Sequence, residues 1–326
     1  MVNRRVLLVD ADRGSLIAGT NTKPYFRLLN SIKSSNDYVA QKNITLDDLN
    51  TIEKTLSDFT TFFIHGTWSD DVNTKSEKII QKFIFDYAAK NKKELVVLET
   101  NLLSRIVPDQ KGFAGIFKYH RIGLDSWLYN KGRFIKNSDQ SRFEAFKKKY
   151  NVNPRDWKKD GDYVLVILGF EGDPSNDLNP VDFINTILPE LKSLDLKIKI
   201  RPHPLTLGNT AQMNIIYDLA KYYNAEIDSE KSFEKSLNSA LFCAMYNSTS
   251  IFQAIWNGIP CYTNINNFGY NISIKDLSNF SSYSYPDRTG WFTEMSWLEY
   301  TREEMFSPSF WPFLVENLLD ANFNNN

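Results

Sequence analysis

Residues 163–175 read Tyr-Val-Leu-Val-Ile-Leu-Gly-Phe-Glu-Gly-Asp-Pro-Ser, an apolar run followed at once by a turn that carries two carboxylates. The run has the length of a strand, and its lack of alternation is typical of a parallel strand covered by helices on both faces. Ligands of open α/β sheets bind beyond the carboxyl ends of such strands. The stretch therefore predicts both the fold class and the edge of the sheet where a site should lie.

The same pattern recurs along the chain. Further strands are expected at Val6–Val9, Thr61–Ile64, Leu95–Leu98, Leu196–Ile200 and Ala240–Ala244. Amphipathic, helix-like segments lie between them at Ser76–Asn91, Pro180–Leu194, Thr210–Tyr223 and Thr249–Trp256. This alternation predicts βαβ units and an α/β fold of two Rossmann-like, doubly wound domains.

Length and one polar interruption indicate two domains. The chain has 326 residues, about twice the usual length of a domain. We interpret the Lys-, Asn- and Asp-rich stretch 131–162 as a helical connector that ends at a domain boundary. The expected domains are 1–155 and 156–295, with an aromatic helical segment, 296–326, crossing back to the first. A membrane-surface or partner-docking element is the alternative for that segment.

Composition argues against several classes of protein. The 38 basic and 39 acidic side chains leave a net charge of -1, which does not suit a nucleic-acid binder. Cys243 and Cys261 lack metal-ligand spacing and are expected to be reduced and buried. The N-terminus lacks the apolar core of a signal peptide, and no apolar run approaches the roughly 20 residues that cross a bilayer. We expect a soluble, cytoplasmic protein without a metal or other cofactor, and contact with the inner face of the membrane stays open.

The turn after Tyr163–Leu168 places Glu171, which Gly169 and Gly172 flank, and then Asp173 at a strand end. Two carboxylates here can act as a base, a nucleophile or a ligand for sugar hydroxyls. An Asp-Pro-Ser turn that begins the next helix is the structural alternative.

The strand Leu196–Ile200 leads into Arg201-Pro-His203-Pro. The prolines restrict the loop, so the imidazole of His203 is held in one place. A cationic Arg201 and a His203 at a strand end suit a phosphate and a leaving group, which favours a catalytic site over a structural histidine.

The strand Ala240–Ala244 is followed by Tyr246-Asn247-Ser248-Thr249-Ser250 at a helix start. Hydroxyl groups there can cap the helix, and the free N–H groups can bind phosphate. Capping needs only one of these residues, so Asn247, Ser248, Thr249 and Ser250 together favour a phosphate cradle.

The N-terminal half offers a second, polar set of candidates. Glu99, Asn101 and Arg105 follow the strand Leu95–Leu98, where they could recognise the hydroxyls of an acceptor. His65 ends another strand and could line the same site. Arg121 is a further candidate for binding the acceptor or sugar, and it begins a segment that could form a lid or hinge, with an interdomain packing loop as an equal alternative.

These motifs, in this order, resemble those of bacterial GT-B glycosyltransferases that use CMP-activated ulosonic acids. The resemblance is greatest to the capsule and lipopolysaccharide β-Kdo transferases. Val164–Ser175 is similar to their strand and Gln-x-x-x-Asp-x-Ser loop, and Lys199–Pro204 to their Lys-Pro-His-Pro motif. Asn247–Pro260 is similar to their Ser/Thr-Ser-x-x-x-Glu-Ala-x-x-x-Gly-x-Pro segment, with Gln253 in place of Glu, and Glu99–Ile106 to their Glu-Asp-Gly-Phe-Leu-Arg-Ser segment.

The resemblance implies a GT-B-like fold in which two domains face a cleft, the first on the acceptor side and the second binding the nucleotide sugar. It implies retaining transfer of Kdo from CMP-β-Kdo to a bacterial surface-polysaccharide or glycolipid acceptor. Asp173 would be the catalytic carboxylate, with Glu171 beside it, and His203 and Ser248–Ser250 would hold the CMP phosphate. A sialyltransferase, another nucleotide-sugar GT-B enzyme, a CDP-polyol transferase and a non-catalytic nucleotide- or glycan-binding module stay open as alternatives.

Overall fold

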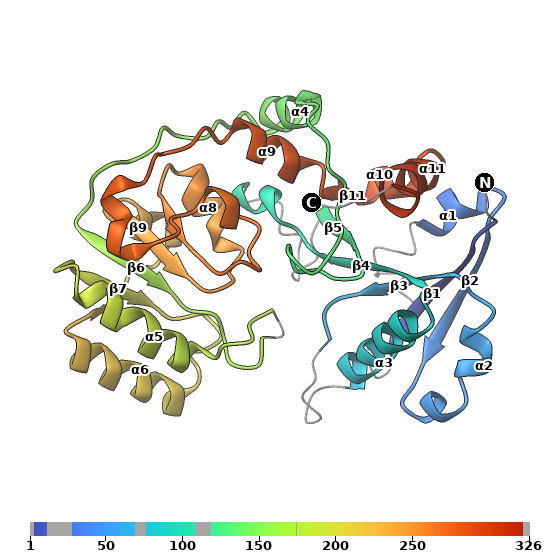
Figure 1. The fold of residues 1–326 in the computed structure, drawn as a ribbon, viewed down its shortest axis with the longest axis horizontal. Coiled ribbons are helices and arrows are strands. Elements are labelled where there is room, and N and C mark those ends of the chain that lie inside the picture. Colours follow the sequence, from blue (N-terminus) through green and yellow to red (C-terminus); the bar gives the residue numbers. More distant parts are fainter. Residues whose placement is uncertain (1–2, 12–27, 69–75, 108–118, 174, 322–326) are drawn as a thin grey trace. The chain divides into compact units, whose positions relative to one another are not determined.

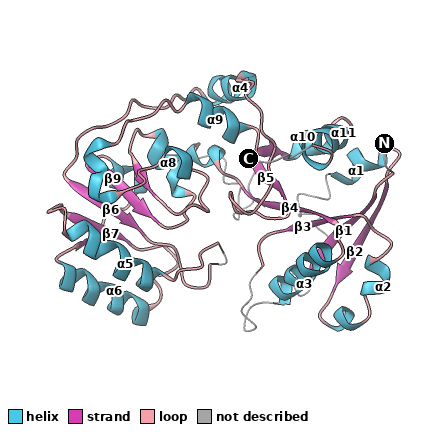
Figure 2. Ribbon diagram, viewed as in Figure 1, coloured by secondary structure: helices cyan, strands magenta, loops and turns pink. Residues whose placement is uncertain are grey.

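The computed structural model describes residues 3–11, 28–68, 76–107, 119–173 and 175–321. The chain divides into two compact units, Met1–Arg142 with Thr293–Asn326 and Phe143–Phe292. Each unit is built on its own sheet, with helices on its faces (Figures 1 and 2).

The division between the units falls inside helix α4 (Ser141–Tyr150) and not near residue 155. Neighbouring side chains of this helix have different partners. Arg142 donates to Glu304 of the first unit at 2.5 Å, whereas Phe143 stacks on Phe292 of the second unit with ring centroids 5.4 Å apart. The polar stretch after α4 contains no further helix up to residue 162.

The first unit holds a six-stranded sheet in the order β11-β5-β4-β3-β1-β2. Neighbouring pairs from β2 to β4 are parallel, and β5 is antiparallel to both of its neighbours. The strands are β1 (Arg5–Ala11), β2 (Tyr38–Ile44), β3 (Thr61–His65), β4 (Glu94–Thr100), β5 (Tyr119–Leu124) and β11 (Glu299–Thr301). The helices are α1 (Leu28–Lys33), α2 (Glu53–Leu56), α3 (Ser76–Lys90), α10 (Arg302–Phe306) and α11 (Phe310–Leu314).

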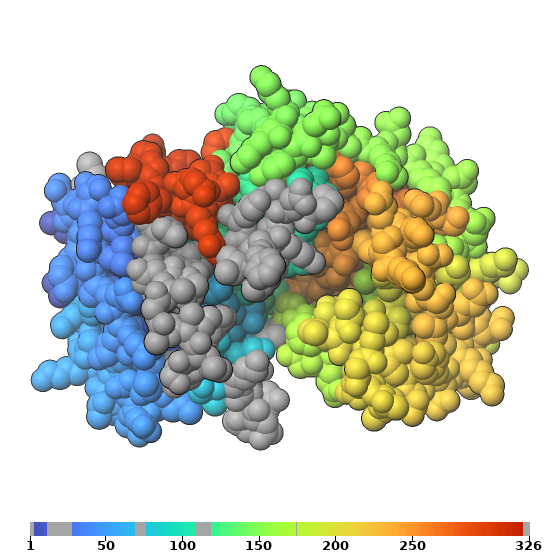
Figure 3. Space-filling view, turned by 180° about the vertical axis from the view of Figure 1, so that it is seen from behind, coloured from blue at the N-terminus to red at the C-terminus, as the bar shows by residue number. Residues whose placement is uncertain are grey.

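Alternate residues of β1 enter opposite cores of the first unit. Leu7 and Val9 pack with α3 on one face of the sheet, and Val6 and Leu8 pack with α1 and the α10–α11 segment on the other. In the space-filling view the red surface of α10 and α11 adjoins the blue surface of the N-terminal residues (Figure 3). The end of the chain therefore completes the core that the first strand begins.

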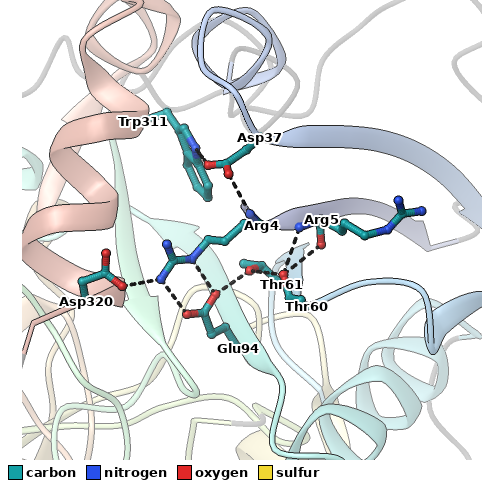
Figure 4. Close-up of polar contacts among 8 residues, drawn as sticks. All are labelled: Arg4, Arg5, Asp37, Thr60, Thr61, Glu94, Trp311 and Asp320. Carbon is teal, nitrogen blue, oxygen red and sulfur yellow. Dashed lines mark hydrogen bonds and ion pairs between the residues drawn. The ribbon is translucent and has the colours of Figure 1, made fainter. Parts of the chain in front are cut away.

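A polar cluster fixes this closing segment to β1 (Figure 4). Arg4 donates to Glu94 at 3.1 Å and to Asp320 at 2.6 Å, and the Trp311 indole donates to Asp37 at 2.7 Å. Burial lowers the pKa of Arg4, but its hydrogen bonds to Glu94 and Asp320 outweigh this effect and raise it above its ordinary value. The carboxylates of Glu94 and Asp320 thus balance the buried positive charge of Arg4.

The second unit holds a five-stranded sheet in the order β10-β9-β6-β7-β8, with every pair parallel. The strands are β6 (Tyr163–Ile167), β7 (Ile198–Arg201), β8 (Glu226–Ile227), β9 (Ala240–Met245) and β10 (Cys261–Tyr262). The helices are α5 (Pro180–Lys192), α6 (Thr210–Tyr223), α7 (Phe233–Leu237), α8 (Ser250–Trp256) and α9 (Thr289–Ser296), the last of which continues into the first unit. The chain reverses its direction of strand addition between β6 and β9, the topological switch point where such sheets bind ligands.

The predicted fold class, α/β with two doubly wound sheets, is confirmed. All six strands expected from apolar runs are present, to within two residues at each end. Three described strands of the first unit, β2, β5 and β11, were not expected. The lid or hinge predicted around Arg121 is wrong, because Arg121 lies in β5 between β4 and β11 and is 6% exposed.

Candidate functional site

Three loops of the second unit leave the sheet at the same edge. In register, Ile167 at the end of β6 lies beside Arg201 at the end of β7 and beside Met245 at the end of β9. Because these strands are parallel and adjacent, the segments that follow them start next to one another. They are the Gly169–Ser175, Pro202–Pro204 and Tyr246–Ser250 loops predicted from the sequence.

The loop after β6 is a tight turn that holds one oxygen of Asp173. Gly172 adopts φ +76°, which a glycine tolerates without strain. Asp173 Oδ1 accepts from the backbone N–H of Ser175 at 2.9 Å and from its hydroxyl at 2.7 Å. Asp173 Oδ2 has no partner among the described residues, and Glu171 is exposed.

The loop after β7 holds His203 against the first loop. The ring of His203 lies 5.1 Å from that of Phe170, between centroids. The backbone N–H of Leu205 donates to His203 Nδ1 at 3.1 Å. Because Nδ1 is an acceptor here, Nε2 carries the proton of the neutral ring. His203 can therefore donate a hydrogen bond from Nε2.

The loop after β9 is bonded to the first loop from the other side. The Asn247 amide donates to the carbonyl of Ser175 at 2.7 Å, and the Tyr246 hydroxyl donates to Asp177 at 2.6 Å. Ser248 Oγ accepts from the backbone N–H of Ser250 at 3.2 Å. Thr249, the first residue before α8, makes no side-chain cap, so its hydroxyl is not used to cap the helix.

The prediction that Arg201 offers a free cation to a phosphate is wrong, because its guanidinium is already bonded within the second unit. Its Nη1 group donates to Asp228 at 2.5 Å, to the Ser236 hydroxyl at 2.9 Å and to the carbonyl of Glu230 at 3.0 Å. The side chain of Asp228 is only 1% exposed. The charge of Arg201 is thus compensated inside the unit, and Arg201 anchors β7 to the segment after β8.

In the first unit, His65 and Glu99 lie at strand ends, Arg105 lies in the short 3-10 helix Leu103–Ile106 after β4, and all three are partly exposed. His65 ends β3, and its ring lies 5.8 Å from that of His120 on β5. Glu99, near the end of β4, accepts from the backbone N–H of Thr100 at 2.6 Å. Arg105 donates from Nη2 to the Thr100 hydroxyl at 2.9 Å, and burial lowers its pKa, against the opposing charge of Glu99.

Asn101 and Arg121 lie inside the first unit, which gives them a structural role. The Asn101 side chain is fully buried and donates to the Ser104 hydroxyl at 2.9 Å. Arg121 stands in register between Glu99 on β4 and Glu299 on β11, so the three charged residues form one row across the sheet. Neither residue is exposed enough to bind an acceptor directly.

Glu299 organises the turn after β4, a role that no sequence pattern indicated. Its carboxylate accepts from the backbone N–H groups of Leu102 and Ser104, both at 2.7 Å, and from the Ser104 hydroxyl at 3.3 Å. Burial raises the pKa of Glu299 to about 6, against the effect of these hydrogen bonds. Because β11 is short and late in the chain, this partner is invisible in the sequence around Glu99.

A fourth loop of the second unit was also missed. The segment after β10 contains Asn264, Asn266 and Asn267, and Asn267 Nδ2 donates to the carbonyl of Ser248 at 3.1 Å. The cluster of asparagines that follows Cys261–Tyr262 is the sequence feature that could have indicated this loop.

In the described ranges no group of three His, Cys, Asp or Glu side chains is placed to hold a metal ion. Over the same ranges, no helix combines the length and the apolar character needed to cross a bilayer.

Comparison with known proteins gives distant structural likenesses. No protein-family model matches the chain, and neither does any curated protein. A solved structure of KpsC from Thermosulfurimonas dismutans, a β-Kdo 2,7 transferase, is similar at a TM-score of 0.48 and 13% identity, over 95% of this chain and 99% of that one. The β-Kdo 2,4 transferase of the same KpsC gives a TM-score of 0.46 at 12% identity, over 92% and 93% of the two chains. The UDP-GlcNAc 2-epimerase of Methanocaldococcus jannaschii, in complex with UDP-GlcNAc and UDP, gives 0.32 at 12% identity, over 88% and 97%.

Proposed function

We propose that this chain is a glycosyltransferase that binds a nucleotide-activated sugar at the carboxyl edge of β9, β6 and β7. We further propose CMP-β-Kdo as the donor, transfer with retention, and a bacterial surface polysaccharide or glycolipid as the acceptor. The choice of donor rests on the resemblance of the sequence motifs to those of the β-Kdo transferases.

One observation carries the proposal of a ligand site at this edge. The loops on either side of the switch point are joined by the bond from Asn247 to Ser175, and the next loop joins them through the contact of Phe170 with His203. The three loops that carry Asp173, His203 and Ser248–Ser250 therefore contact one another, which supports a common ligand site.

The chemistry of a CMP-activated sugar suits these groups. When the bond between the sugar carbon and the phosphate oxygen breaks, negative charge grows on the phosphate and positive charge on the sugar ring. His203 Nε2–H and the donors around Ser248–Ser250 are suited to stabilise the phosphate. Since Arg201 is already paired with Asp228, the proposed site relies on hydrogen-bond donors and not on a free arginine.

Asp173 is the proposed nucleophile. Its Oδ1 is held by Ser175, which leaves Oδ2 to attack the anomeric carbon. The electron pair of the broken bond leaves with CMP. In the second step the acceptor oxygen attacks the same carbon, loses its proton to a base, and releases the Asp173 carboxylate, so the configuration is retained.

The test is a donor panel followed by one substitution. CMP, UDP and GDP sugars are offered with a lipid-linked or oligosaccharide acceptor, and nucleotide release is measured; CMP release with an unchanged anomeric configuration in the product is expected. Asp173→Ala should abolish transfer and still bind CMP, whereas Asp218→Ala, an exposed change on α6, should keep both transfer and CMP binding. Full activity of Asp173→Ala would end the assignment, and tight CMP binding without turnover on any acceptor would favour a binding module.

A further inference from the structure

A pocket of about 240 Å³ lies in the second unit between the first turns of α5 and α6. It is smaller than the roughly 300–1,000 Å³ of pockets for drug-sized ligands, so it suits a single ring-sized group. Its lining combines polar and apolar residues: Glu171, Asn179, Asn209 and Gln212, with Val181, Ala211 and Ile215. No residue in this lining is cationic.

Gln212 is the unusual member of the lining. The residue is 7% exposed, yet its side-chain amide has no hydrogen-bond partner among the described residues. The other buried glutamine, Gln81 in the first unit, donates to the carbonyl of His65. The Nε2 and Oε1 atoms of Gln212 are not among the fully buried atoms that lack a partner, so the amide keeps access to the open pocket, where it can bond to water or to a ligand. Because Gln212 lines the pocket, a ligand there is the natural partner.

The remaining polar groups define what that partner can be. Asp182 already bonds to both polar atoms of the Asn179 amide. The Asp182 backbone N–H donates to Asn179 Oδ1 at 2.9 Å, and Asn179 Nδ2 donates to the Asp182 carboxylate at 2.5 Å. Asn209 Oδ1 accepts from the Gln212 backbone at 3.2 Å, which leaves its N–H2 group as a donor. The Glu171 carboxylate, without a partner in the described part of the chain, is a pure acceptor. The pocket thus offers one carboxylate, two amides and an apolar wall.

We propose that this pocket binds uncharged hydroxyl groups of the transferred sugar. A hydroxyl can donate to Glu171 and accept from an amide N–H of Asn209 or Gln212, while the C–H face of a sugar packs on Val181, Ala211 and Ile215. A phosphate or carboxylate would meet Glu171 without a compensating cation, so the charged groups of the donor lie outside the pocket. The inference rests on the proposed function, because Glu171 is two residues from Asp173.

Two variants and two probes test it. Glu171→Gln and Gln212→Leu nearly preserve side-chain volume, and Glu190→Gln, exposed on α5 and outside the pocket, is the matched control. Binding of CMP, and of free Kdo with and without saturating CMP, is measured by ligand-observed NMR titration. Each pocket variant should weaken Kdo binding by about tenfold, which is the effect of losing one hydrogen bond. CMP binding should be unchanged in all three variants, and the control should match the wild type for both probes.

The outcomes separate this inference from the proposed function. If CMP binds and Kdo binds equally to wild type and both pocket variants, the pocket is not the sugar site and the inference is overturned, while the nucleotide site stands. If Kdo binding depends on Glu171 and Gln212 but CMP does not bind at all, the pocket stands and the proposed donor is wrong. Because Glu171 is exposed, failure of Gln212→Leu to fold would still leave Glu171→Gln to decide.

Discussion

Replacing Glu299 with Gln should change how the stability of the first unit depends on pH. Burial raises the pKa of the Glu299 carboxyl from 4.5 to about 6, against the hydrogen bonds from Leu102 and Ser104. The folded unit therefore holds this proton more tightly than the unfolded chain does. The stabilisation is complete below about pH 4.5 and is lost as the pH rises through about 6. At about 1.4 kcal/mol per pKa unit, the loss is about 2 kcal/mol.

The assay is urea unfolding of wild type and Glu299→Gln at a series of pH values, with the free energy of unfolding taken from the transition of the first unit. The Gln side chain cannot accept from both N–H groups, which lowers stability at every pH. The informative quantity is the wild-type value minus the variant value, which should fall by about 2 kcal/mol between about pH 4.5 and 7.5. Glu303→Gln, an exposed change on α10, should follow the wild-type curve.

Parallel curves for wild type and Glu299→Gln would refute the reasoning. They would mean that the carboxyl of Glu299 titrates as it does in water, so that the backbone donors of Leu102 and Ser104 fully offset its burial. Hydrogen exchange at these two amides gives an independent check, because protonation of Glu299 should weaken their hydrogen bonds and lower their protection factors below about pH 6.

His203→Ala should lower the rate of transfer by about a hundredfold or more, measured as nucleotide release, without unfolding the protein; an unchanged rate would make the histidine structural. Asp228→Ala leaves the Arg201 cation without its carboxylate and should destabilise the second unit by about 3–5 kcal/mol in urea unfolding, and a loss below about 1 kcal/mol would show that Arg201 finds water instead. Gly258→Ala should cost more than Gly172→Ala: both have positive φ, worth about 1–2 kcal/mol, but only at Gly258 would the new Cβ lie 1.9 Å from a backbone oxygen. Equal melting temperatures for these two variants would contradict that difference.

The sequence was sufficient for those strands that are apolar on both faces. β6 and β4 are buried along most of their length, and such runs are distinctive in a sequence. β5 was missed because Tyr-His-Arg-Ile-Gly-Leu carries two polar residues that are buried all the same. In register they lie beside polar residues of the neighbouring strands, Arg121 beside Glu99 and Glu299, and a single segment does not reveal its neighbours.

The same limit applies to the candidate sites. The three loops of the second unit could be predicted to lie together, because each follows a strand of the same parallel sheet and such strands end at one edge. Which of their side chains already have a hydrogen-bond or ionic partner within the protein could not be predicted. Arg201 is paired with Asp228, which follows the two-residue strand β8, and the turn after β4 depends on Glu299, far along the chain.

The return of the chain to its first unit has a consequence for synthesis on the ribosome. β5 pairs with β11, and Arg4 bonds to Asp320, so the unit that emerges first lacks a strand, a helical layer and a counter-ion until residues 299–320 have been made. The second unit, Phe143–Phe292, is contiguous and needs nothing from the terminal segment for its own sheet. The order of completion is therefore the reverse of the order of translation, and a premature stop after residue 292 should leave the early half, and not the late one, to aggregate or be degraded.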